Sequence, residues 1–213
     1  DPQGNEHKLV LPMPGRFNVA NALVALAVSE LAGLPIEDAL AGIAHVVVPG
    51  RLQRIDEGQD YLAIVDYAHK PAAVAAVIAT LRSEIKGRLC VVLGAGGDRD
   101  ASKRAIMGRE AARGSDLFIV TDDNPRSEDP AVIRAAVEAG AYELPTEERG
   151  EVRNIGDRAA AIRAAIAWAE PGDAVLVAGK GHETGQNVNG VIHHFDDREE
   201  VRAALQERRT GSL

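Results

Sequence analysis

Apolar positions along this chain first follow a helical spacing and then form short strand-like runs. Residues 16–33 carry apolar side chains at helical spacing and end at a glycine, and a second short helix is predicted after Pro35. The segment Val46–Arg51 contains a Pro-Gly pair that breaks this pattern and predicts a hinge. The helical pattern therefore ends at this hinge, and a different pattern begins beyond it.

Beyond the hinge, β-branched runs alternate with longer helical patterns. The predicted strands are residues 52–56, 61–66, 88–94, 116–121, 151–154, 173–178 and 191–195. The predicted helices are residues 71–82, 101–113, 130–140, 157–169 and 197–208. The first two strands predict a hairpin. The remaining alternation predicts βαβ units, and hence a Rossmann-like α/β fold with a mostly parallel sheet covered by helices on both faces.

Composition narrows the possible partners and the compartment. The 213 residues carry a formal net charge of −8 with both signs interspersed, which argues against nucleic-acid or anionic-membrane partners. The single cysteine, Cys90, lies in an apolar run, so no disulfide framework forms within the chain and a reducing compartment fits. The sequence contains neither a signal peptide nor a run of about 18 apolar residues. We expect a cytoplasmic protein without a membrane span.

Candidate chemistry gathers where predicted strands end, and the run Thr121–Arg126 is the most informative case. In an open α/β sheet, residues just past a strand's carboxyl end line the ligand crevice. Arg126 would pair with a carboxylate and Asp123 would accept from an ammonium, so the run suits the zwitterionic end of an amino acid. The alternative is that Asn124–Pro125 is only a turn and Asp129 only caps the next helix.

Two glycine-rich turns follow other predicted strands. Gly94–Asp100 permits close backbone approach before a helix start that favours anions, but its spacing is neither GxGxxG nor that of a phosphate loop. Gly179–Gly185 also fails the phosphate-loop pattern. Within it, Glu183 would suit an ammonium, and the open backbone at Gly179 would supply a carbonyl. Each segment is also compatible with a plain tight turn.

The histidines give weaker evidence for a ligand or metal site. In Asp66–Pro71, the carboxylate and imidazole could hold a ribose and a phosphate, although His69 alone is more typical of a structural histidine. The other histidines considered lack metal-ligand spacing with cysteine or carboxylate pairs, so no zinc site is predicted. The histidines concerned are His182, His193 and His194. His193 and His194 are interpreted as exposed residues of a strand.

Taken in order, these motifs make the chain resemble the carboxyl-terminal portion of the Mur ligases, ATP-dependent amide-forming enzymes of peptidoglycan synthesis. The matching segments are Gly15–Asn21, Asp66–His69, Gly97–Asp100, Asp123–Arg126 and Gly179–Glu183. The Asp-Asn-Pro-Arg form is similar to that of the members that add meso-diaminopimelate to UDP-MurNAc-L-Ala-D-Glu.

The resemblance implies roles for the matching positions. The distal carboxylate of meso-diaminopimelate would be held by Arg99, Asn124 and Arg126. Its distal ammonium would be received by Asp123, Gly179 and Glu183, and Pro125 belongs to the same motif. Lysine lacks that carboxylate and would leave two guanidinium groups unpaired, at roughly 1.5–3 kcal/mol each, so strong discrimination is expected.

The resemblance also implies ATP and Mg²⁺ as cofactors and an acyl-phosphate intermediate on the D-glutamyl γ-carboxylate. Asn21 would face the adenine, Arg51 the phosphates or ribose, and Asp66 the ribose hydroxyls. The family's phosphate loop, its carbamylated lysine for magnesium and its UDP-binding domain do not occur in these residues. We therefore expect residues 1–48 to be the tail of the central ATP-binding domain and residues 50–213 the carboxyl-terminal domain. Alone, the chain is expected to be inactive, with no catalytic or metal-binding residue of its own, and the N-terminal and central domains would be its partners.

Two other functions stay open. A Rossmann-type dinucleotide-binding oxidoreductase could use the Gly94–Gly97 turn, although the glycine spacing is wrong for it. A stand-alone, non-catalytic amino-acid-binding module would need the same charged residues but no contacts to ATP.

Overall fold

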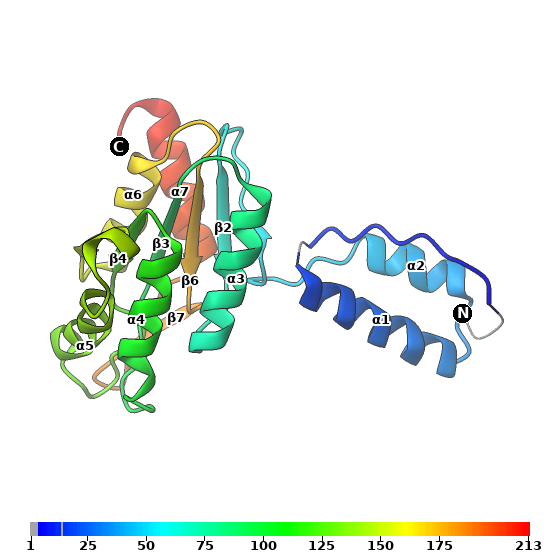
Figure 1. The fold of residues 1–213 in the computed structure, drawn as a ribbon, viewed down its shortest axis with the longest axis horizontal. Coiled ribbons are helices and arrows are strands. Elements are labelled where there is room, and N and C mark those ends of the chain that lie inside the picture. The colour runs from blue at the N-terminus through cyan, green and yellow to red at the C-terminus, as the bar shows by residue number, and fades with distance from the viewer. Residues whose placement is uncertain (1–3, 14) are drawn as a thin grey trace. The chain divides into compact units, whose positions relative to one another are not determined.

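The computed structural model describes residues 4–13 and 15–213. The described residues divide into two compact units, one up to Val48 and one from Pro49 to Leu213 (Figure 1). The boundary between the units falls inside the predicted hinge segment Val46–Arg51. The first unit contains α1 (Arg16–Leu31) and α2 (Ile36–Ala44), which are the two helices expected from the apolar spacing. Many apolar side chains of α1 are exposed, and Leu31 reaches 88%.

The second unit is built on a six-stranded sheet with the order β1-β2-β6-β3-β4-β5. Its strands are β1 (Gln53–Arg54), β2 (Leu62–Asp66), β3 (Leu89–Leu93), β4 (Leu117–Val120), β5 (Glu151–Asn154) and β6 (Ala174–Ala178). β1 pairs with β2 in the antiparallel sense, which confirms the predicted hairpin, and every other pairing in this sheet is parallel.

Helices cover both faces of this sheet, as the sequence predicts (Figure 1). They are α3 (Pro71–Glu84), α4 (Lys103–Gly114), α5 (Pro130–Tyr142), α6 (Arg158–Trp168) and α7 (Asp197–Thr210). Alternate residues of β3 face opposite sides, so Val91 packs with the α3–α5 layer and Val92 with the α6–α7 layer. All five residues of β3 are buried, as expected of a central parallel strand.

The chain order of the strands creates a reversal at the centre of the sheet. β3, β4 and β5 follow one another outward through α4 and α5, and the chain then returns through α6 to insert β6 between β2 and β3. Such a reversal separates the loops on either side of it and opens a crevice at the carboxyl ends of the strands. The loops after β2, β3, β4 and β6 are therefore brought to one edge.

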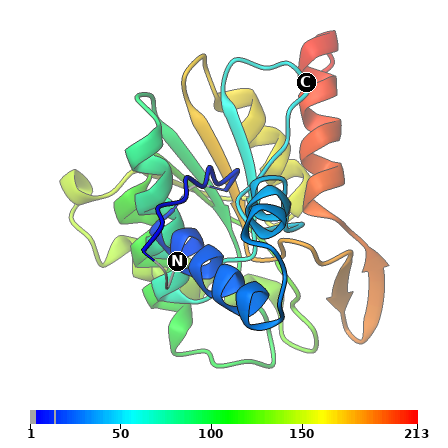
Figure 2. The same cartoon turned by 90° about the vertical axis from the view of Figure 1, so that its right-hand side faces the viewer.

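The last part of the sheet prediction is wrong. Residues 191–195 were expected to join the parallel sheet, but β8 (Val191–His194) pairs instead with β7 (Gly185–Val188) in a separate antiparallel hairpin. Figure 2 shows this hairpin standing apart from the six-stranded sheet. β7 was not predicted, because its residues are only half-buried and its Gly-Gln-Asn start lacks strand-like alternation. Among the described residues, no helix is long and apolar enough to span a membrane.

Two glycines allow α4 and α5 to pack unusually close together. A Cβ added to Gly108 would lie 1.8 Å from the carbonyl oxygen of Val137, and one added to Gly140 would lie 1.8 Å from that of Ala105. Both contacts are with backbone, so the helices would have to separate. Since α4 and α5 follow the two loops that carry the charged motifs, their spacing affects the site above them.

We expect Gly140→Ala to lower the free energy of unfolding by about 1–3 kcal/mol through overpacking. An unconstrained helical glycine would instead gain roughly 0.5–1 kcal/mol from the same change. Chemical denaturation measures the difference, with Ala139→Ser at the neighbouring exposed position as control. A stabilised Gly140→Ala variant would contradict the close approach.

Candidate functional site

A cleft of ≈ 260 Å³ opens at the carboxyl edge of the sheet and is lined by the loops after β2, β3, β4 and β6. It brings together six of the seven residues predicted for the amino acid, namely Arg99, Asp123, Asn124, Arg126, Gly179 and Glu183. The seventh, Pro125, is buried and not among the residues that line the cleft. Further residues that line the cleft are Tyr67, His69, Lys103 and Met107.

Glycines are needed where the loop after β3 meets the loop after β4. A Cβ on Gly94 would lie 2.4 Å from the carbonyl oxygen of Thr121, and one on Gly97 would lie 2.0 Å from that of Pro125. The Gly97 amide also donates to the carbonyl of Asn124 at 2.9 Å. These glycines are therefore required for packing between the two loops, which holds the cleft's walls at a fixed separation.

The basic side of the cleft is formed by Arg99 and Arg126, which flank Gly96. An added Cβ on Gly96 would meet the guanidinium of Arg126 at 2.9 Å and the Arg99 stem at 3.8 Å. Arg126 has a φ of 53°, unusual for a residue other than glycine, and its Nη1 donates to the Gly97 carbonyl at 2.6 Å. Arg99 is exposed. Arg126 is thus held in place by a hydrogen bond, whereas Arg99 is exposed at the rim of the cleft.

Asp98, next to Arg99, ties the two loops together and does not line the cleft. It accepts from the Ser127 hydroxyl at 2.7 Å and the Ser127 amide at 3.2 Å, and these bonds hold the pKa of its carboxyl below the ordinary value. The Asp98 amide donates to Glu128 at 2.6 Å, and Glu128 in turn accepts from buried Arg104 at 2.8 Å. Each of the two loops is therefore braced by the other.

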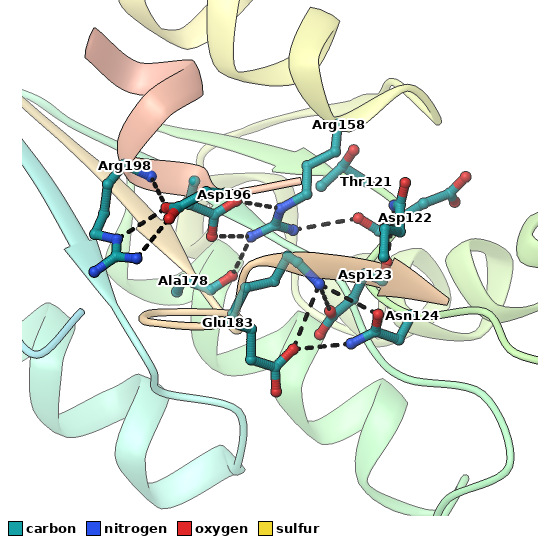
Figure 3. Close-up of polar contacts among 12 residues, drawn as sticks. Thr121, Asp122, Asp123, Asn124, Arg158, Ala178, Glu183, Asp196 and Arg198 are labelled. Carbon is teal, nitrogen blue, oxygen red and sulfur yellow. Dashed lines mark hydrogen bonds and ion pairs between the residues drawn. The ribbon is translucent and has the colours of Figure 1, made fainter. Parts of the chain in front are cut away.

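The acidic side is centred on a lysine that sequence reasoning missed. Lys180 is fully buried, and its Nζ lies 3.5 Å from an oxygen of Asp123 and 3.4 Å from one of Glu183. The same nitrogen lies 3.3 Å from the amide oxygen of Asn124, whose Nδ2 donates to Glu183 at 3.0 Å. Figure 3 shows the side chains of Asp123, Asn124 and Glu183 pointing toward one another.

The β7–β8 hairpin holds the loop after β4 from the other side. Gln186 donates from its side chain to the carbonyl of Asp123 at 2.8 Å, and the Asn187 amide donates to Asn124 Oδ1 at 2.9 Å. The Arg126 amide donates to the Asn187 carbonyl at 2.9 Å, and the Arg126 carbonyl accepts from the Asn189 amide at 2.7 Å. The unusual backbone of Arg126 is thus stabilised by β7 and the turn that follows it, which the sequence did not predict.

A buried ion pair lies beneath the acidic side. Arg158 and Asp197 both have fully buried side chains, and two guanidinium nitrogens donate to the carboxylate at 2.7 and 2.8 Å. Nη1 of Arg158 donates to the carbonyl of Asp122 at 3.3 Å, and Nη2 also donates to the carbonyl of Ala178 at 3.0 Å (Figure 3). Burial acts to lower the pKa of Arg158, but the carboxylates around it, Asp197 first, raise it above the ordinary value. The pair therefore joins the ends of β4 and β6 to the start of α7.

Comparison with known proteins now places this arrangement in a family. A family model described as "Mur ligase, glutamate ligase domain" matches residues 50–181. The chain belongs to the Mur ligase family. It is 60% identical over 214 residues to the UDP-N-acetylmuramoyl-L-alanyl-D-glutamate–2,6-diaminopimelate ligase of Corynebacterium glutamicum, covering 100% of this chain and 41% of that protein.

Solved structures agree with the fold of this Mur ligase chain. A structure of a UDP-N-acetylmuramoyl-L-alanyl-D-glutamate–2,6-diaminopimelate ligase has a TM-score of 0.72 and 38% identity, covering 97% of this chain and 42% of that one. A Mycobacterium tuberculosis folylpolyglutamate synthase complexed with ADP has a TM-score of 0.60 and 26% identity, covering 80% and 39%. The chain therefore spans about two fifths of the length of the relatives it matches.

The residues predicted for ATP lie in both units of this Mur ligase chain. Asp66 is buried, and its two oxygens accept from the amides of Leu52 at 2.7 Å and Ala68 at 2.8 Å. Burial raises the pKa of the Asp66 carboxyl above its ordinary value. Arg51 stacks over the Tyr67 ring at 4.5 Å, beside the cleft. Asn21 lies in α1 of the first unit and donates to Asn18 at 3.4 Å.

Several smaller predictions have clear outcomes. Asp129 caps α5 by accepting from the Ala131 amide at 2.8 Å, so that part of the structural interpretation is confirmed. Asp122, within the predicted run, does not line the cleft and forms an ion pair with Arg134. His193 and His194 lie exposed on β8, as expected, and His194 bonds with Glu199 at 2.6 Å.

We expect Arg158→Met to lower the free energy of unfolding by about 3–5 kcal/mol, because Asp197 would be left as an uncompensated buried charge. Adding Asp197→Leu should recover part of that loss, while the unpaired carbonyls of Asp122 and Ala178 keep the double variant below the parent. Denaturation of the single and double variants measures both effects. Additive losses in the double variant would contradict the assignment of the pair as one coupled unit.

Proposed function

We propose that this chain carries the amino-acid site of an ATP-dependent ligase that adds meso-diaminopimelate to UDP-MurNAc-L-Ala-D-Glu in cytoplasmic peptidoglycan precursor synthesis. The observation that carries the proposal is the polarity of the cleft. The cleft is lined by the cations Arg99, Lys103 and Arg126 and by the carboxylates of Asp123 and Glu183, so it offers partners to both charges of a zwitterionic amino-acid end. The names of the similar diaminopimelate ligases support the same substrate.

On the basic side, Arg99 and Arg126 would hold the distal carboxylate together with the amide nitrogen of Asn124. Asn124 Nδ2 has two hydrogens and uses one on Glu183, so one stays available for the ligand. Arg126 already has its position fixed by the Gly97 carbonyl, which lowers the entropy lost on binding. Lysine offers no partner to these donors, and the site therefore favours meso-diaminopimelate.

On the acidic side, Glu183 is the best placed acceptor for the distal ammonium. Its side chain is 37% exposed, whereas that of Asp123 is only 10% exposed and lies next to Lys180. Gly179, with a φ of 117°, adds an open stretch of backbone to the same wall. Asp123 then acts mainly through the charge it contributes behind Glu183.

ATP would bind beside this site, where Arg51 and Asp66 of the second unit would contact it. Each Asp66 oxygen accepts one backbone hydrogen bond and keeps a lone pair for a ribose hydroxyl. Mg²⁺ would supply charge neutralisation during phosphoryl transfer. The chain's own residues orient the amino acid, whose amine would attack the activated γ-carboxyl group.

The proposal predicts selective binding by the chain itself. In amide NMR titrations, meso-diaminopimelate should shift the resonances of Arg99, Asn124, Arg126 and Glu183, and L-lysine should bind at least about tenfold more weakly, because each unpaired charged donor costs roughly 1.5–3 kcal/mol. Equal affinity for both ligands, or no binding of either, would contradict a preformed site for the distal carboxylate.

Two variants separate the two sides of the cleft. Arg126→Met should weaken only meso-diaminopimelate and so reduce the preference over lysine, while Glu183→Gln should weaken both ligands. Arg54→Met, at an exposed arginine of β1, is the matched control and should change neither.

Nucleotide binding separates the ligase from a stand-alone amino-acid module. We expect ADP, at millimolar concentration, to shift the amide resonances of Asp66 and Tyr67, since a ribose hydroxyl would donate to the Asp66 carboxylate. NADH serves as the comparison ligand. Shifts with NADH but not with ADP would favour the oxidoreductase alternative, and shifts with neither would favour the amino-acid module.

A further inference from the structure

Lys180 is a buried cation whose location the proposed function does not by itself explain. Its side chain is fully buried, so it is not available as a direct contact for a ligand that enters from solvent. Burying an ammonium is costly unless it is well paired. Its three contacts, at 3.3 to 3.5 Å, are all longer than the 2.7–2.9 Å typical of a charge-assisted hydrogen bond. The ammonium is therefore shared among three oxygens instead of paired with one.

Lys180 also sets the charge of the acidic side. The side chains that meet around it and the neighbouring ion pair comprise two cations and three carboxylates, which leaves one formal negative charge. The cations are Lys180 and Arg158, and the carboxylates are Asp123, Glu183 and Asp197. One residual negative charge matches one ligand ammonium. Without Lys180 the group would carry two, and Asp123 and Glu183 would repel each other.

The orientation of the Asn124 amide depends on the same ammonium. Asn124 Oδ1 accepts from Lys180 and from the Asn187 amide, so the oxygen is turned toward two donors. Nδ2 must then face Glu183, with its second hydrogen available to the cleft. A reversed amide would set NH₂ against an ammonium and present only an acceptor on the other side.

We propose that Lys180 is a positioning residue for substrate selectivity, which holds Asn124 with its NH₂ toward the ligand carboxylate and cancels one of the two acidic charges. This inference rests on the proposed amino-acid site. It differs from a purely structural role because it concerns the preference for a ligand with a distal carboxylate over one that has only an ammonium.

The test compares Lys180→Met, which keeps most of the side-chain volume, with the parent chain. We expect the affinity ratio of meso-diaminopimelate to L-lysine to fall at least about tenfold, because Asn124 is no longer oriented while the extra negative charge still attracts lysine. Lys86→Met removes a lysine charge from an exposed position at the opposite end of β3 and should leave the ratio unchanged. A ratio in Lys180→Met equal to that of the parent would overturn the proposal.

Chemical rescue distinguishes the ammonium from general packing. Lys180→Ala removes a fragment equivalent to propylammonium, so adding propylammonium should restore the ratio, whereas 1-propanol, of similar size but neutral, should not. Rescue by both compounds would show that volume alone matters and would count against the proposal. If Lys180→Met does not fold, the comparison of Lys180→Ala with and without propylammonium decides the question.

A measurement without any amino acid separates this inference from the proposed function. Hydrogen exchange at the Asn187 amide reports the bond to Asn124, and it should be faster in Lys180→Met than in the parent. If the parent chain binds neither amino acid, the proposed site fails, and the positioning role is then judged on this exchange rate alone. An unchanged rate would overturn the positioning role in that case.

Discussion

The insertion of β6 between β2 and β3 is the constraint on which the rest of the site depends. β6 pairs in parallel with both neighbours along its full length, from Ala174 to Ala178. Its carboxyl end therefore lies beside theirs, and the loop that begins at Gly179 enters the space between the loops after β2 and β4. A strand added at the sheet's edge would place the same residues on the wrong side of the cleft.

The position of β6 also determines how the buried charged groups are paired. Polar groups at the ends of buried strands cannot reach bulk water, so each must be paired within the protein. Arg158 serves two carbonyls and Asp197, and Lys180 serves three oxygens of the cleft wall. The arrangement holds the carboxylates in place before a ligand arrives. Preorganisation of this kind reduces the free energy spent on ordering the site during binding.

Most of the fold could be predicted because the main sheet gives strong local signals. β3 and β6 are continuous apolar runs, and the helices between the strands have clear apolar spacing and N-terminal caps such as Asp129. The β7–β8 hairpin could not be predicted in the same way. Its residues are partly exposed and polar, and periodicity does not tell which strand a segment will pair with.

The candidate site, like the fold, could be predicted only in part. The charged residues that line the cleft could be grouped from the sequence because they follow strand ends, where a crevice is expected. The residues that hold these side chains in place were not predicted. Lys180 stands in a Gly-Lys-Gly sequence that resembles part of a phosphate loop, and nothing in the sequence indicates that its side chain is buried. Gln186 and Asn187 were missed because their hydrogen bonds join segments more than sixty residues apart.

Under the proposed function, selectivity between meso-diaminopimelate and lysine would depend on residues that contact neither ligand. Both ligands carry the ammonium, so the acidic side alone cannot tell them apart. Discrimination would come from donors that lysine leaves unsatisfied, and such donors discriminate only if they cannot turn away to other partners. Arg126 is held by Gly97 and the hairpin, and Asn124 is held by Lys180 and Asn187. In the proposed site, the stiffness of these supports, more than the number of charges in the cleft, would make a missing carboxylate costly.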